Sequence, residues 1–125
     1  MAANRPLRVG PVALTTTLTT NIFNPPTTTG GVNVTADITG TYVILRHIRI
    51  VNKTSAAATF SLWLGATGGN VAGTEVIGTG YSVAANSAFD WYGVLRMTAS
   101  DFLVGGAGTT TALTFEAEGE IGVAG

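Results

Sequence analysis

Alternation of hydrophobic and polar residues runs through this chain and predicts β-strands along most of its length. The strongest segment, 42–52 (YVILRHIRIVN), is rich in Val and Ile and is largely apolar on both faces. Strict alternation would place Ile44, Ile48 and Ile50 on one face of this strand and His47 on the other. We therefore expect a central strand that is covered on both sides.

Further segments of the same kind predict an all-β domain. They lie at residues 13–24, 32–38, 59–64, 74–77, 81–83, 89–97 and 111–123. Because 59–64 follows a turn at 53–55, we expect it to pair with 42–52 as a hairpin. Residues 98–101 (TASD) resemble a capping box for one helical turn that Gly105–Gly106 would end. About eight strands at this spacing predict a single antiparallel β-sandwich of jelly-roll-like form.

The beginning of the chain differs from the rest in its prolines and basic residues. It holds two of the four prolines, and Arg5 and Arg8 are two of the six basic residues. Proline cannot donate to a sheet ladder. We therefore expect residues 1–12 to form an extended arm outside the core, and residues 13–125 to form the sandwich domain.

The scarcity of charged residues indicates that this domain is part of an assembly and does not act as a free monomer. Charged residues make up 10% of the chain, against about a quarter in ordinary soluble domains. A small domain relies on charged surface to remain soluble and monomeric, so we expect other protein copies to cover much of this one. The net charge of −1 provides no basic field for nucleic acid or for an anionic membrane. No apolar run approaches the length of about 20 residues that spans a membrane.

Few residues could carry chemistry. The chain has no Cys and one histidine, which argues against disulfides, thiolate chemistry and a transition-metal site. No motif places a nucleophile beside His47, so we interpret it as a packed residue rather than a catalytic one. The glycine-rich segments 65–73 and 105–108 lack the Lys-Ser/Thr ending of a phosphate-binding loop. We therefore expect no enzyme activity, no small-molecule substrate and no cofactor.

Three carboxylates alternate along the last predicted strand. Glu116, Glu118 and Glu120 lie two residues apart and therefore share one face. Such a stripe could bind calcium or form a glycosidase pair. We favour a third interpretation, in which arginines of a neighbouring strand or subunit neutralise the stripe. Three arginines are available within the sandwich: Arg46, Arg49 and Arg96.

Aromatic residues offer contacts for a partner. Trp91 shares a face with Phe89 and is expected in the core, whereas Trp63 and Tyr92 lie on the opposite faces of their strands. The predicted interface residues are Arg5, Arg8, Trp63, Tyr92, Glu116, Glu118 and Glu120.

Two long stretches carry a resemblance to a known group of proteins. Residues 42–68 (YVILRHIRIVNKTSAAATFSLWLGATG) and 87–106 (SAFDWYGVLRMTASDFLVGG), with the closing 116–125 (EAEGEIGVAG), resemble small β-sandwich structural proteins of tailed bacteriophage virions. The resemblance implies a non-enzymatic protein located in the virion and assembled in the host bacterial cytoplasm.

Within that family, we expect a capsid decoration (cement) protein. Its partners would be the major capsid protein and copies of itself, with a trimer favoured. The alternatives are a protein of the tail tip, baseplate or fibre and, ranked below these, a carbohydrate-binding module or a glycosidase that uses the glutamate stripe.

Overall fold

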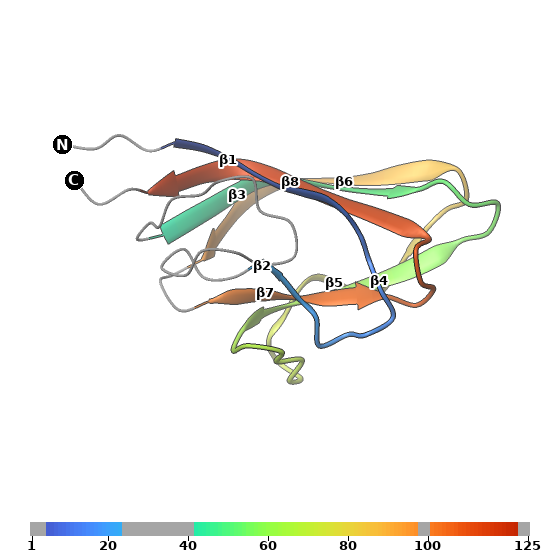
Figure 1. The fold of residues 1–125 in the computed structure, drawn as a ribbon, viewed down its shortest axis with the longest axis horizontal. Helices are drawn as coiled ribbons and strands as arrows, with labels where there is room; N and C mark the ends of the chain where they lie inside the picture. Colours follow the sequence, from blue (N-terminus) through green and yellow to red (C-terminus); the bar gives the residue numbers. More distant parts are fainter. Residues whose placement is uncertain (1–4, 24–41, 98–100, 123–125) are drawn as a thin grey trace.

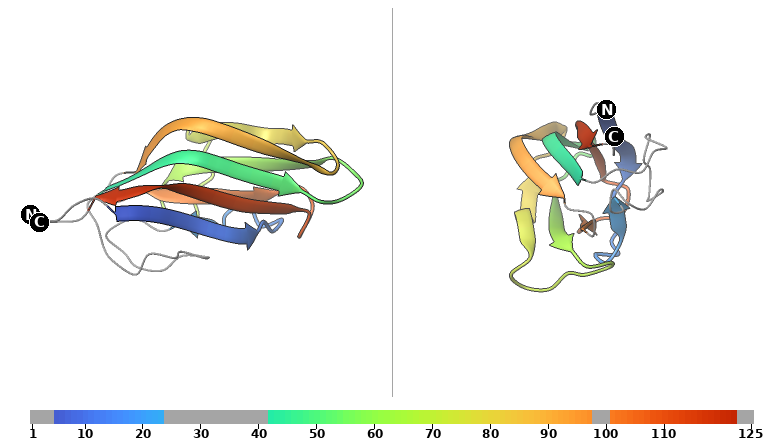
Figure 2. Two further views of the ribbon diagram at one scale, coloured as in Figure 1. Left: turned by 90° about the horizontal axis from the view of Figure 1, so that it is seen from above. Right: turned by 90° about the vertical axis from the view of Figure 1, so that its left-hand side faces the viewer.

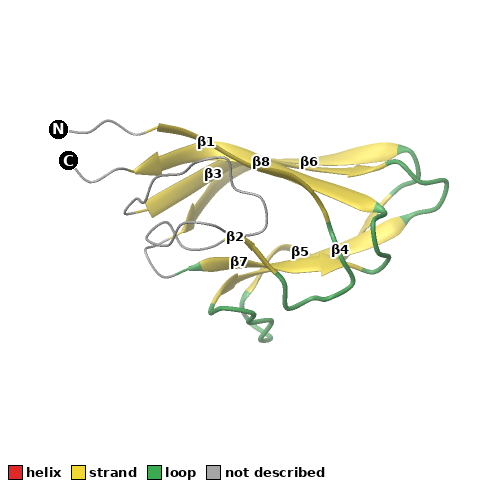
Figure 3. Ribbon diagram, in the orientation of Figure 1, coloured by secondary structure: helices red, strands yellow, loops and turns green. Residues whose placement is uncertain are grey.

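The protein folds into two four-stranded β-sheets that pack face to face (Figure 1). The computed structural model describes residues 5–23, 42–97 and 101–122. The strands are β1 (Arg5–Ala13), β2 (Asn21–Phe23), β3 (Tyr42–Asn52), β4 (Ala58–Gly65), β5 (Glu75–Val83), β6 (Ser87–Met97), β7 (Phe102–Ala107) and β8 (Leu113–Gly122). No helix is present among the described residues (Figure 3), so none there could cross a membrane. The predicted all-β sandwich is confirmed.

The strand order is that of a jelly roll. Sheet A has the order β1-β8-β3-β6, and sheet B has the order β2-β7-β4-β5. The first strand pairs with the last, β2 with β7, β3 with β6 and β4 with β5, all antiparallel. The chain therefore follows the path of one long hairpin that is rolled so that successive pairs alternate between the sheets. Figure 2 shows the two layers from above and end-on.

The hydrophobic core lies between the inner faces of the two sheets. Val9, Leu45, Phe60, Leu103 and Phe115 come from five different strands, and each is at most 1% exposed. Complete burial of one such side chain contributes about 1.5–3 kcal/mol. The core therefore joins segments that are distant in the sequence.

A β-bulge in β3 overturns the predicted assignment of its faces. The register of β3 shifts between Leu45 and His47 relative to both neighbouring strands. The alternation consequently changes phase at Arg46, and the buried residues are Leu45 before the bulge and Ile48 after it. Ile44 therefore faces outward with His47, contrary to strict alternation. The strand is central in its sheet, but its outer face is not covered along its length, because Arg46 is exposed.

The predicted hairpin between 42–52 and 59–64 is wrong, because β4 belongs to the other sheet. The connection at residues 53–57 crosses from sheet A to sheet B, and buried Asn52 stabilises it. Asn52 Nδ2 donates to the carbonyls of Ala56 (2.9 Å) and Val83 (3.0 Å), and its Oδ1 accepts from the backbone N–H of Thr54 (2.9 Å). One side chain thus joins the β3–β4 connection to the end of β5.

The first described residues are extended as predicted, but they are part of the sandwich. Residues 5–13 form β1, which pairs with β8 and buries Leu7 and Val9 in the core. The expectation of an arm outside the core is therefore wrong for this segment. Burial of Leu7 and Val9 stabilises this strand. Its two prolines are tolerated because the strand lies at the edge of the sheet, where one side of its backbone needs no partner. Residues 1–4 lie outside the described part of the chain.

Two further predictions differ from the structure. Within the described residues of the predicted strand at 13–24, Ala13 ends β1 and Asn21–Phe23 form β2, while residues 14–20 form a loop; the segment at 32–38 lies outside the described residues. Gly105 and Gly106 do not end a helical turn but lie within β7. A Cβ atom at Gly105 would collide with the backbone oxygen of Ser61, so β7 and β4 approach closely there.

Candidate interaction surface

Most of the charged residues gather on the outer face of sheet A. This surface, called the charged face below, holds four of the six Lys and Arg residues, four of the seven Asp and Glu residues and the only histidine. Its members are Arg8, Arg46, His47, Arg49, Asp90, Arg96, Glu116, Glu118 and Glu120. The cross-strand registers place bases beside acids, since Arg8 lies opposite Glu118 and Arg49 lies opposite both Glu116 and Asp90.

His47 is the centre of the charged face. Its Nε2 lies 2.8 Å from Oδ1 of Asp90 on β6, and its Nδ1 lies 3.2 Å from Oε1 of Glu118 on β8. The ring of Tyr92 stacks on the imidazole, with 4.6 Å between ring centroids and 10° between planes. Three strands are thereby joined through one side chain that is 16% exposed.

These contacts favour the protonated imidazole. The hydrogen bond to Asp90 raises the pKa of His47 above its ordinary value of 6.5, and the Glu118 carboxylate raises it further against the opposing effect of burial. A protonated ring donates from both nitrogens, and both face carboxylates here. Both ring nitrogens of His47 are therefore engaged by carboxylates from the neighbouring strands.

The glutamate stripe faces cations of the neighbouring strand. Arg46 Nη2 lies 3.2 Å from Oε1 of Glu120, and His47 contacts Glu118. The favoured interpretation, neutralisation by arginines of a neighbouring strand, therefore describes Glu120, whereas Glu118 contacts His47, which the sequence analysis did not foresee. The bulge at Arg46 is the reason, because it turns His47 to the outer face. Among the described residues, no group of His, Asp and Glu has the arrangement of a metal site.

The predicted interface residues fall into different environments. Tyr92 is 74% exposed, whereas Trp63 is 6% exposed and offers no contact surface, contrary to the prediction. Trp63 lies beside Val104 on the outer face of sheet B, which the loop at 14–20 crosses: a Cβ atom at Gly106 would come within 3.3 Å of Leu18 Cδ2. Arg8 lies on the charged face and is exposed, and the side chain of Arg5 lies outside the described part.

An exposed hydrophobic side of the sandwich was not predicted. Four of the five exposed large hydrophobic residues are Val71, Tyr81, Tyr92 and Val94. They belong to β5, β6 and the loop before β5, and these two strands are the edges of the two sheets on the same side of the sandwich (Figure 2). The rings of Tyr81 and Phe89 lie 4.8 Å apart across this side. Val94 was recognisable in the sequence, since it lies two residues from Tyr92 on one strand face.

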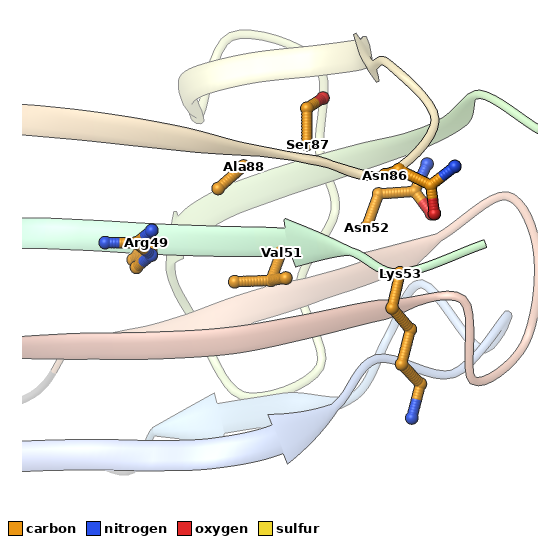
Figure 4. Close-up of a pocket in the computed structure, with 7 residues that line it drawn as sticks. All are labelled: Arg49, Val51, Asn52, Lys53, Asn86, Ser87 and Ala88. Atoms are coloured by element: carbon orange, nitrogen blue, oxygen red, sulfur yellow. The ribbon is translucent and has the colours of Figure 1, made fainter. Parts of the chain in front are cut away.

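A shallow pocket of about 410 Å³ lies where the β3–β4 and β5–β6 loops meet (Figure 4). Its lining residues are Arg49, Val51, Asn52, Lys53, Asn86, Ser87 and Ala88. The two cations do not converge on one point, because Lys53 extends away from Asn86 and Arg49 lies further along the strand (Figure 4). We therefore interpret the pocket as an open depression between loops.

Comparisons of the chain with protein-family models, with curated proteins and with solved structures found no match. The resemblance to virion proteins therefore rests on the quoted sequence stretches alone.

Proposed function

We propose that this chain is a non-enzymatic structural protein of a bacteriophage particle, a capsid decoration protein that binds the lattice of the major capsid protein as a homo-oligomer. The observation that carries the proposal is the uneven surface of the sandwich. Beyond the charged face, the described side chains add charges only at Lys53, Glu75 and Asp101. Of the exposed large hydrophobic residues, Tyr92 and Val94 lie at the β6 margin of that same face, and Tyr81 lies on β5.

A surface with so few charges suits burial against other subunits. The centres of protein interfaces are depleted of charge and enriched in aromatic residues, and exposed apolar patches mark interaction sites. A decoration protein also gains attachment from the many copies on one particle, because each contact raises the effective concentration of the next. Most of the described charges lie on one face, where they can select the orientation of a partner.

The described polar groups support binding rather than catalysis. Both nitrogens of His47 are engaged by carboxylates, and basic side chains contact two of the three stripe glutamates. A glycosidase needs one carboxylic acid and one carboxylate that face a shared sugar. Here Glu118 and Glu120 face His47 and Arg46 instead.

The copy number of the protein in purified particles tests the proposal. Quantitative gel or mass-spectrometric analysis of virions should give a copy number comparable to that of the major capsid protein. A copy number far lower, at the level of tail components, would support the tail-associated alternative instead. Absence of the protein from purified virions would overturn both.

A further inference from the structure

Strand β6 presents a long edge that is open to another strand. It runs over Ser87–Met97 at the end of sheet A, and among the strands of the described residues only β3 pairs with it. The register between the two strands shifts at Gly93 and Val94, which lie opposite Arg46. Tyr92 is 74% exposed and Val94 is 64% exposed near the middle of this strand. An exposed, hydrophobic edge of this length is a template for pairing with another chain.

The residues of β6 are arranged symmetrically about Gly93. Asp90 lies three residues before Gly93 and Arg96 lies three residues after it, and both face outward. If a second copy pairs antiparallel with a two-fold axis at Gly93, each Asp90 lies opposite Arg96 of the second copy. The same register places each Tyr92 opposite Val94 of the second copy.

Other two-fold registers lose this match. In an antiparallel pair, directly opposed side chains point to the same side of the sheet. The two-fold axis therefore lies between the two copies of one residue, and not between two adjacent positions of the strand. An axis at Tyr92 would place Asp90 opposite Val94, and an axis at Val94 would place Arg96 opposite Tyr92. Only the axis at Gly93 brings the two charged residues of β6 together.

We propose that β6 pairs with β6 of a second copy of this chain about a two-fold axis at Gly93, forming one continuous eight-stranded sheet. This inference rests on the homo-oligomer of the proposed function and names the surface that builds it. It also gives the basic unit as a dimer, whereas the sequence led us to favour a trimer. Both charged faces then lie on the same side of the extended sheet.

The inner side of the edge supports the same pairing. Phe89, Trp91 and Leu95 are only half-buried, and the register places Trp91 opposite Leu95 of the second copy. Trp91 lies along its own strand, since a Cβ atom at Gly93 would be 2.7 Å from its Cζ2. The axis therefore passes through a position without a side chain, while half-buried hydrophobic groups on either side become covered.

Charge exchange between two variants tests the proposal in isolated protein. Arg96→Asp and Asp90→Arg each replace both attractive pairs of the dimer with repulsive ones, and each should weaken self-association about tenfold or more. An equimolar mixture of the two variants restores opposite charges at both pairs. We therefore expect heterodimers in the mixture, measured by sedimentation equilibrium after circular dichroism has shown that each variant is folded.

Asp90 also contacts His47 within its own subunit, so Asp90→Arg removes an internal contact as well. The test therefore includes variants of Arg96 that leave this contact in place. Should Asp90→Arg fail to fold, Arg96→Asp alone must still weaken the dimer, while Arg96→Lys must retain it. A monomeric or trimeric wild-type protein at about 100 μM, a concentration at which even weak interfaces associate, would overturn the proposal, as would a mixture that does not associate. Particle copy number is an independent result, so a monomer found in virions would refute the dimer and leave the proposed function standing.

Discussion

Sheet A ends in two strands of different character. At one edge, β1 contains Pro6 and Pro11, and its register shifts between Val9 and Val12. At the other edge, β6 has no proline over its length and exposes Tyr92. A proline removes a backbone hydrogen-bond donor from an edge, so β6 keeps more of its N–H groups available for pairing than β1 does, although the register of β6 to β3 also shifts at Gly93 and Val94.

The difference between the two edges indicates where a further strand can be added to sheet A. Because β1 contains two prolines and β6 contains none, we expect strand addition at the β6 side of sheet A. The two edges also relate differently to the core. β1 buries Leu7 and Val9, whereas outward-facing residues of β6 remain exposed. The first edge therefore contributes to the core, whereas the second leaves large side chains exposed at the margin of sheet A.

Removal of β1 should have the largest effect on stability. Deletion of residues 2–12 removes the buried side chains of Leu7 and Val9 and strips β8 of a neighbour. The loss of burial alone costs about 3–6 kcal/mol, out of a typical total of about 5–15 kcal/mol. Urea denaturation followed by circular dichroism should show a destabilised or unfolded chain. Deletion of residues 2–4, which ends before β1, is the control, and an equal midpoint for both deletions would contradict the role of β1.

Charge placed on the β6 edge should affect assembly and leave folding intact. Val94→Lys puts a cation beside the proposed axis and should weaken dimerisation about tenfold or more. The free energy of unfolding of the monomer should change by less than about 0.5 kcal/mol, since Val94 is exposed. Val71→Lys makes the same substitution at an exposed valine outside β6 and should leave the sedimentation profile unchanged. Equal effects of the two substitutions would show that β6 is not special.

The contact that joins β6 to β3 through His47 should have a smaller, pH-dependent effect. His47→Gln should lower the free energy of unfolding by about 1 kcal/mol at about pH 5.5, because the imidazolium loses charge-assisted bonds to Asp90 and Glu118. The pKa of His47 is raised in the folded state, so this stabilisation is complete below 6.5 and is lost as the pH rises through the folded value. Denaturation at about pH 5.5 and about pH 9 should therefore show the difference shrinking with pH. A constant difference would mean that packing on Tyr92, rather than charge, is the role of His47.

The ion pair that joins β3 to β8 should have the smallest effect. Arg46 and Glu120 lie 3.2 Å apart, but their side chains are 54% and 33% exposed. A double-mutant cycle with Arg46→Ala and Glu120→Ala should give a coupling below about 1 kcal/mol, and added salt should reduce it. A coupling that salt does not change would indicate that this pair is less hydrated than its exposure indicates.

The glutamate stripe shows which features of the charged face could be predicted from the sequence. Uninterrupted alternation in β8 places Phe115 inward and Glu116, Glu118 and Glu120 outward, as predicted. The partners of the stripe were foreseen as arginines, and Arg46 does contact Glu120. The part of His47 was missed because a bulge adds one residue to the alternation, and no local pattern marks it.

By itself, the sequence determined the fold class and the bounds of the strongest predicted strand, because a run of strand-forming residues is a local property that each strand carries independently. The segment 42–52 became β3 with the predicted bounds. The tertiary structure decided which strands are neighbours: β4 left β3 for the other sheet, and β1 joined β8 across almost the whole chain. Strand pairing depends on residues that are far apart in sequence. Among the possible pairings, the stable one buries the hydrophobic inner faces of both sheets. The open edge of β6 is a result of that selection, since a strand becomes an edge only when the rest of the sheet is complete.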